Sequence, residues 1–184
     1  MKGIEKELIK GIWALPSFLV MMVTVGHNIM TAAAFHFYSF KPPSVMVGII
    51  HDKFTNLLIN EYNEFGINIP TTDQIKIIRI CGSVSGKEGV DKYALAGITP
   101  MNGMKIKSSL IKECPLNLEC QVVHKVGYPG SHQWLVGEVK AVPKDENYSK
   151  EQVLMFWAAS IARLGSFWRK AGSRWLVASH SQLP

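Results

Sequence analysis

The sequence predicts a mainly β domain with helical excursions, arranged as a β-barrel. Predicted strands outnumber predicted helices, and several strands are short with long interruptions between them. This pattern favours a barrel over a parallel α/β sheet. The chain has 184 residues, of which 47% are hydrophobic, enough for one domain with its own core. We therefore expect residues 1–184 to form a single domain.

Two strands are predicted near the start of the chain. Phe18–Val25 and Ser44–Ile50 are rich in apolar and β-branched residues, and turn signals bound each of them. The pair Pro42-Pro43 lacks two backbone donors, so it must lead into the second strand from outside the sheet.

The middle of the chain alternates short helices with one strand. Thr55–Tyr62 is predicted to be a helix capped by its first residue, and Phe65–Ile69 a strand that ends at a proline. Thr71–Ile80 has helical spacing behind a good cap, and Asp91–Ala96 is a further short helix. The small polar residues of Gly82–Gly89 predict a loop between them.

The last clear strands are Leu118–Lys125 and Gln133–Val142, whose alternating pattern predicts a hairpin. The tail from Glu151 is predicted to begin as a helix. That prediction depends on the spacing of its apolar residues, namely Val153, Leu154, Phe156, Trp157 and Ile161.

The charge balance is mildly positive and excludes few classes of protein. The chain carries 20 basic and 14 acidic residues, a net charge of +6. The lysines are scattered, so the charge fits a phosphate-bearing small molecule better than nucleic acid. A small basic barrel that binds nucleic acid is the alternative, but the interleaved aromatic and basic stripe of such sites is absent from the sequence. We expect no nucleic-acid partner.

Cysteine usage and the N-terminal segment lead us to expect a cytoplasmic protein. The odd number of cysteines, three, and the absence of a secretory signal favour reduced thiols, and the absence of a C-x-x-C pair argues against a metal site. Ile12–Val25 is the longest apolar stretch, and Pro16 interrupts it, so no membrane span is expected. The first ten residues have mixed charge, unlike a signal peptide.

Familiar catalytic motifs are missing from the sequence. It contains no G-x-G-x-x-G, phosphate-loop, G-x-S-x-G or H-E-x-x-H pattern. Small polar residues cluster instead at Asn28–Ala34, at Ser39–Pro43 and at Lys53 with Thr55. Taken singly, these are a polar turn, a lead-in to a strand and a helix cap, although a lysine at a helix start also suits a phosphate.

Taken together and in order, these segments resemble the flavin reductase-like family, flavoredoxins included. The resemblance covers about residues 12–142, and residues 151–184 form a C-terminal extension. The matching segments are Thr24–Ala33, Ser39-x-x-Pro42-Pro43, Lys53-x-Thr55, Phe65–Pro70, Cys81-Gly82-x-Val84-Ser85-Gly86, Asp91-Lys92-Tyr93, Gly97–Pro100 and Val136–Val139.

The resemblance implies an FMN-binding split β-barrel, usually a homodimer, with the flavin in a cleft near the subunit interface. FAD is less favoured, because its adenine end would lie outside the matching segments. The residues implied to run along the isoalloxazine and ribityl chain are Asn28, Met30, Thr31, Ala32 and Ala33. Ser39 would reach the flavin, Lys53 and Thr55 would hold the phosphate, and Ser83, Ser85 and Gly86 would close the site.

The activity implied is hydride transfer from NADH or NADPH into the flavin, with electrons passed to free flavin, ferric iron or a partner protein. The family often carries Gly-Asp-His where this chain has Gly130-Ser131-His132. His132 is thus a candidate catalytic residue beside a nicotinamide, or else a loop histidine without a role. Because the acidic neighbour is absent, a flavoredoxin-type electron carrier without its own nucleotide site stays open. Cys81 is expected to be a buried packing residue.

Overall fold

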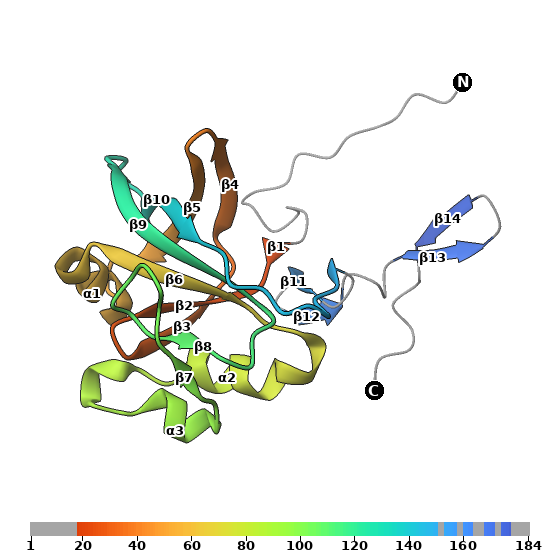
Figure 1. Ribbon diagram of the computed structural model, residues 1–184, viewed down its shortest axis with the longest axis horizontal. Helices are drawn as coiled ribbons and strands as arrows, with labels where there is room; N and C mark the ends of the chain where they lie inside the picture. Colours follow the sequence, from red (N-terminus) through yellow and green to blue (C-terminus); the bar gives the residue numbers. More distant parts are fainter. Residues whose placement is uncertain (1–17, 151–152, 158–159, 164–167, 172–173, 178–184) are drawn as a thin grey trace.

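The structure confirms the predicted mainly β fold. It is a computed structural model that describes residues 18–150, 153–157, 160–163, 168–171 and 174–177. Its centre is a curled seven-stranded antiparallel sheet, with a few short helices along one edge and one end (Figure 1). The expected apolar lead-in at residues 12–17 lies outside the described residues.

The central sheet contains the longer strands. In chain order they are β2 (Met21–Val25), β3 (Asn28–Ala32), β4 (Phe35–Phe40), β5 (Pro43–Ile50), β6 (Glu64–Ile69), β9 (Leu116–Val126) and β10 (His132–Ala141). The shorter strands are β1 (Phe18–Leu19), β7 (Pro100–Met101), β8 (Leu110–Ile111), β11 (Leu154–Trp157), β12 (Ser160–Arg163), β13 (Trp168–Ala171) and β14 (Arg174–Val177). The helices are α1 (Phe54–Tyr62), α2 (Ile75–Ser83) and α3 (Lys92–Ala96), with single 3₁₀ turns at Thr72–Gln74 and Gly86–Glu88.

Strand order in the central sheet is β3-β2-β6-β9-β10-β5-β4. The predicted hairpin is present as β9 and β10, and the diproline leads into β5, which begins at Pro43. The predicted strand over residues 18–25 is divided at Val20. The backbone N–H of Val20 donates to Leu154 O at 2.9 Å, which ties the small sheet of β1, β11 and β12 to the central one.

Two strands of the central sheet, β3 and β4, were not predicted by sequence pattern. Asn28–Ala32 mixes polar, apolar and small residues without a clear alternation, yet it pairs along its whole length with β2 across a two-residue turn. Gly26 starts that turn with φ +57°, a conformation in which glycine is favoured. Strand β4 is an edge strand whose side chains are largely exposed, so the alternation of a half-buried strand is absent.

The helix predictions are confirmed with three corrections. The helix predicted over Thr71–Ile80 is a 3₁₀ turn at Thr72–Gln74 followed by α2, which begins at Ile75 and runs to Ser83, into the predicted loop. Helix α3 follows Asp91, whose carboxylate accepts from the N–H groups of Tyr93 and Ala94. Helix α1 begins at Phe54, one residue before its predicted cap; the Thr55 side chain instead accepts a hydrogen bond from Asn28. The predicted helix at the start of the tail is wrong, because Leu154–Trp157 is β11, paired with β1 and β12. A short apolar run fits either period, and here strand partners decide it.

Strand β2 is buried on both faces, and this organises the interior. Met21, Val23 and Val25 point into the core inside the curled sheet, with Phe65 and Leu135. Val20 and Met22 point the other way, into a second core formed with α2 and α3. Alternate strand residues face opposite sides of a sheet, so one continuous apolar strand serves both cores.

A buried polar network anchors the 104–111 segment to the sheet. Glu119 is fully buried, and its carboxylate accepts from the backbone N–H groups of Met104, Lys105 and Ile106 at 2.6–3.1 Å. Glu64 accepts from the N–H and hydroxyl of Ser108, whose Oγ accepts from the N–H of Gly26 at 2.9 Å. The segment therefore holds the β2–β3 turn immediately before Asn28.

Candidate functional site

A cavity of about 420 Å³ opens beside β3. Its walls come from β3 and the two residues after it, the inner end of β5, the start of α1, the end of α2 with residues 84–86, Lys92 of α3 and His132 of β10. Of the residues implied by the sequence, those that line it are Asn28, Met30, Thr31, Ala32, Ala33, Lys53, Thr55, Ser83, Ser85, Gly86 and His132. Segments from five parts of the chain thus meet around one space.

Asn28 leaves an unpaired acceptor at this cavity. Its Nδ2 donates to Thr55 Oγ1 at 2.9 Å, while its buried Oδ1 has no partner among the described residues. A buried carbonyl without a donor is costly, so a ligand N–H or O–H would stabilise it. Since Thr55 Oγ1 accepts from Asn28, the hydroxyl proton of Thr55 is left for another acceptor.

Gly86 allows the closing segment to approach Asn28. A Cβ at residue 86 would lie 2.2 Å from Asn28 Oδ1 and 3.4 Å from the ring of Phe54. Any side chain there would therefore push against the unpaired amide. The closing segment therefore packs directly against the Asn28 amide and fixes its position beside the cavity.

Two lysines, Lys53 and Lys92, against one carboxylate, Asp52, give the cavity a net positive charge. Lys53 is exposed at the start of α1, whereas Lys92 is buried, and its ammonium donates to Ile29 O at 2.7 Å and to Cys81 O at 3.2 Å. The third Lys92 donor has no partner in the described part of the chain. Burial lowers the pKa of Lys92, and the charge of Lys53 lowers it further. An anion in the cavity would offset both effects.

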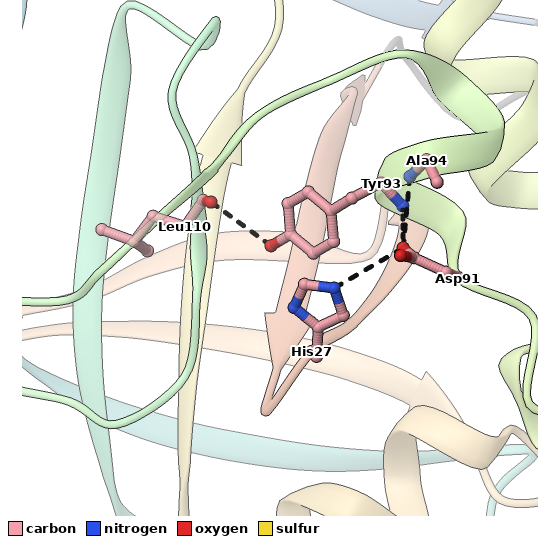
Figure 2. Close-up of polar contacts among 5 residues, drawn as sticks. All are labelled: His27, Asp91, Tyr93, Ala94 and Leu110. Atoms are coloured by element: carbon pink, nitrogen blue, oxygen red, sulfur yellow. Dashed lines mark hydrogen bonds and ion pairs between the residues drawn. The ribbon is translucent and has the colours of Figure 1, made fainter.

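Lys92 is a cavity residue that sequence reasoning missed. It stands in the matching Asp91-Lys92-Tyr93 segment, but a lysine in a short helix gives no sign of burial. Figure 2 shows how α3 is held in place: His27 stacks on Tyr93 with ring centroids 4.5 Å apart, and Tyr93 Oη donates to Leu110 O. Asp91 caps the helix and lies 3.5 Å from His27 Nε2.

Thr31 and Gly82 join β3 to α2. The Thr31 hydroxyl donates to Ile78 O at 2.7 Å, so its proton holds the helix and only its lone pairs are left for a ligand. A Cβ at Gly82 would lie 3.2 Å from Thr31 Cβ. The close contact brings the end of α2 against the cavity wall.

His132 lines the cavity at the point where β10 begins opposite Ile50. Its Nδ1 is 2.9 Å from Ser131 Oγ, and His51 Nε2 is 3.0 Å from Gly130 O in the same loop. Ser39 does not line the cavity; its Oγ accepts from the N–H of Lys41 in the β4–β5 hairpin. The contact implied for Ser39 stays a prediction.

Cys81 is buried in the second core, as expected for a packing residue, and it also lines the cavity. Burial raises its pKa to about 11, while nearby Lys92 lowers it in part. The side chain is therefore a thiol at neutral pH and no nucleophile.

We expect native Cys81 to resist alkylation by iodoacetamide at pH 8. With a pKa near 11 rather than 9.0, its thiolate fraction is about a hundredfold lower than that of a free cysteine, and the rate follows this fraction. Mass spectrometry of native protein, with urea-unfolded protein as the control, measures it. The rate should climb as the pH approaches 11, and labelling of Cys81 within minutes at pH 8 would contradict this assignment.

Two other site classes find no support among the described residues. They contain no group of three His, Cys, Asp or Glu side chains placed to bind a metal ion. In the same residues, no helix combines the length and apolarity that a membrane crossing requires.

Comparison with known proteins points to one family. The flavin reductase like domain model matches residues 15–165. An uncharacterised protein of Archaeoglobus fulgidus is 33% identical over 139 residues, which is 76% of this chain and 77% of that protein.

Solved structures share the fold. The flavoredoxin of Methanosarcina acetivorans is 28% identical with a TM-score of 0.80, over 92% of this chain and 95% of that one. The NADH:FAD oxidoreductase of Streptomyces globisporus is 23% identical with a TM-score of 0.71, over 80% and 86%. These likenesses confirm the predicted split-barrel fold.

Proposed function

Since this chain belongs to the flavin reductase-like family, we propose that it binds FMN and acts as an NADH- or NADPH-dependent oxidoreductase. Electrons would pass from the flavin to free flavin, ferric iron or a partner protein. The family and its relatives support a flavin-linked oxidoreductase; the choice of FMN, the nucleotide and the acceptor belong to the proposal.

The observation that carries the proposal is the unpaired Asn28 Oδ1 inside an electropositive cavity. The flavin ring and ribityl chain carry hydrogen-bond donors for such an acceptor, and the phosphate of FMN is an anion that can pair with the Lys53 ammonium. Bound FMN would supply the hydride chemistry, while the chain supplies placement and charge. This is why no familiar catalytic motif is needed.

Each cavity wall has a role in this proposal. The backbone and small side chains of Met30, Thr31, Ala32 and Ala33 would lie along the isoalloxazine and ribityl chain. Lys53, the free Thr55 hydroxyl proton and the N–H groups at the start of α1 would hold the phosphate. Ser83, Ser85 and Gly86 would close the site.

Replacing Lys53 by alanine should weaken FMN binding more than riboflavin binding, because only FMN carries the phosphate. The loss for FMN should be on the order of 1–2 kcal/mol, or about tenfold in Kd. Fluorescence titration of both flavins measures it, with Lys125→Ala as a control, since Lys125 bonds Asn60 away from the cavity. Equal losses of affinity for both flavins would contradict a contact between Lys53 and the phosphate.

Replacing His132 by alanine should slow flavin reduction by NADH or NADPH by about tenfold or more while leaving FMN affinity nearly unchanged. His132 lines the cavity, where it can position a nicotinamide against the flavin. Anaerobic stopped-flow absorbance of FMN-loaded protein follows the reaction. His124→Ala is the matched control, because His124 is an exposed histidine of β9 outside the cavity.

The same experiment discriminates the second candidate function, a flavoredoxin-type electron carrier. This candidate is favoured by Ser131, which pairs with His132 where the family often has an acid. A carrier would bind FMN yet show no bleaching by either nucleotide. Rapid bleaching of the unmodified protein that is slowed in His132→Ala would reject the carrier.

Homodimer formation, implied by the family resemblance, is part of the proposal. The edge strand β4 offers an exposed aromatic surface for it, with Phe37 packed on Phe40, whose side chain is 83% exposed. Such a surface is typical of a protein interface. FMN is preferred to FAD because the matching segments include no residues for an adenine end.

A further inference from the structure

A second cavity, of about 460 Å³, adjoins the first. It lies between β3 and α2, and Thr31–Ala33 with Gly82–Ser83 line both cavities. Thr31 and Gly82, which contact each other, thus line both spaces. A molecule in the second cavity would therefore lie beside whatever occupies the first.

The lining of the second cavity is mostly apolar. Its polar side chains are one cation and the hydroxyls of Thr31 and Ser83, which already donate to Ile78 O and Ile80 O. Val20 and Ile78, both buried core residues, line it together with the alanines after Thr31. A surface of this kind suits a flat hydrocarbon or aromatic group. Its volume is within the range of small-molecule sites.

The cation is Arg79, an exposed residue of α2 at this cavity. Arg79 makes no ion pair or side-chain hydrogen bond with any residue that the structure describes. A guanidinium is always charged and presents a planar fork that matches a carboxylate or phosphate in two parallel hydrogen bonds. An apolar chamber with one unpaired fork is complementary to a molecule with an apolar body and one anionic group.

We propose that this second cavity binds the second substrate of the flavin site, and that this substrate is a flat apolar molecule carrying one carboxylate or phosphate held by Arg79. The inference rests on the proposed function, because the occupant of the second cavity is a substrate only if the first cavity holds the flavin. The binding site itself depends only on residues of this chain. Arg79 would be the specificity-determining residue.

Calorimetric titration with 2-naphthoate and its neutral amide, 2-naphthamide, tests the proposal. It is run on FMN-loaded protein and on flavin-free protein, with the visible flavin spectrum recorded alongside. We expect naphthoate to bind the unmodified protein about tenfold or more tightly than the amide, as charge-assisted hydrogen bonds are stronger than neutral ones. Arg79→Met should abolish that preference, and Lys76→Met, an exposed change on the same helix outside the cavity, should keep it.

Each outcome is decisive. A naphthoate preference that disappears only in Arg79→Met supports the proposal, and a shift of the flavin spectrum on binding places the probe beside the flavin. Equal affinity for acid and amide, or no binding of either, overturns it. If the protein takes up no FMN, the proposed flavin function fails instead, and the flavin-free titration still tests the Arg79 site.

Discussion

Replacing Gly86 by alanine should raise the Kd for FMN by about tenfold or more. The new Cβ would lie 2.2 Å from Asn28 Oδ1, so the Asn28 side chain must move and break its hydrogen bond to Thr55. That bond fixes both the unpaired acceptor and the direction of the Thr55 hydroxyl. Losing their placement costs about 1–2 kcal/mol of binding free energy, and 1.4 kcal/mol is a factor of ten.

Fluorescence titration of FMN measures the effect of Gly86→Ala. Gly127→Ala is the matched control, because a Cβ at residue 127 meets nothing within 4 Å. An unchanged Kd in Gly86→Ala would show that FMN binding does not depend on the placement of the Asn28 side chain.

Replacing Glu119 by glutamine should lower the free energy of unfolding by about 3 kcal/mol or more, since a buried charged acceptor of several N–H groups is lost. The Glu119 carboxylate accepts from three consecutive N–H groups. An amide would turn its own donors toward at least one of them. For a chain of this size the change corresponds to a fall in Tm of about 6–12 °C.

Urea unfolding of Glu119→Gln gives the free energy directly, and Glu138→Gln is the control. Glu138 is a partly exposed carboxylate paired with Lys140 on the surface, so its loss should cost less than about 1 kcal/mol. Equal effects of the two substitutions would contradict a role for Glu119 as the anchor of the 104–106 segment. FMN affinity should fall with stability in Glu119→Gln, because this segment leads to Ser108 and the turn before Asn28.

The predictable part of the fold is where one face, or both, of an element is apolar. Strands β5, β6, β9 and β10 and helix α3 were evident from pattern and caps. Strand β3 was not, because Asn28 and Thr31 are chosen for a cavity rather than for a sheet core. The Leu154–Trp157 run was predicted to be helical but is a strand. One of its two strand partners, β1, lies more than a hundred residues away in the sequence, where no local pattern can reveal it.

The candidate site was predictable in composition but not in its contacts. Asn28 and Thr55 stand out as polar residues, yet only the fold shows that they touch and that one Asn28 atom is left unpaired. Lys92 and Arg79 are cations that line the two cavities and that the sequence did not predict. No local pattern separates a buried or cavity-lining cation from a surface one. Ser39, which the resemblance placed at the flavin, lies in the β4–β5 hairpin outside the cavity.

The most direct measurement is the visible absorption spectrum of the purified protein, recorded before and after addition of FMN and desalting. If the cavity beside Asn28 is a flavin site, the desalted protein retains FMN in a one-to-one ratio, and Gly86→Ala retains less. A protein that is colourless after FMN addition and desalting would contradict flavin binding. The chain would then be a split barrel whose cavity binds another ligand.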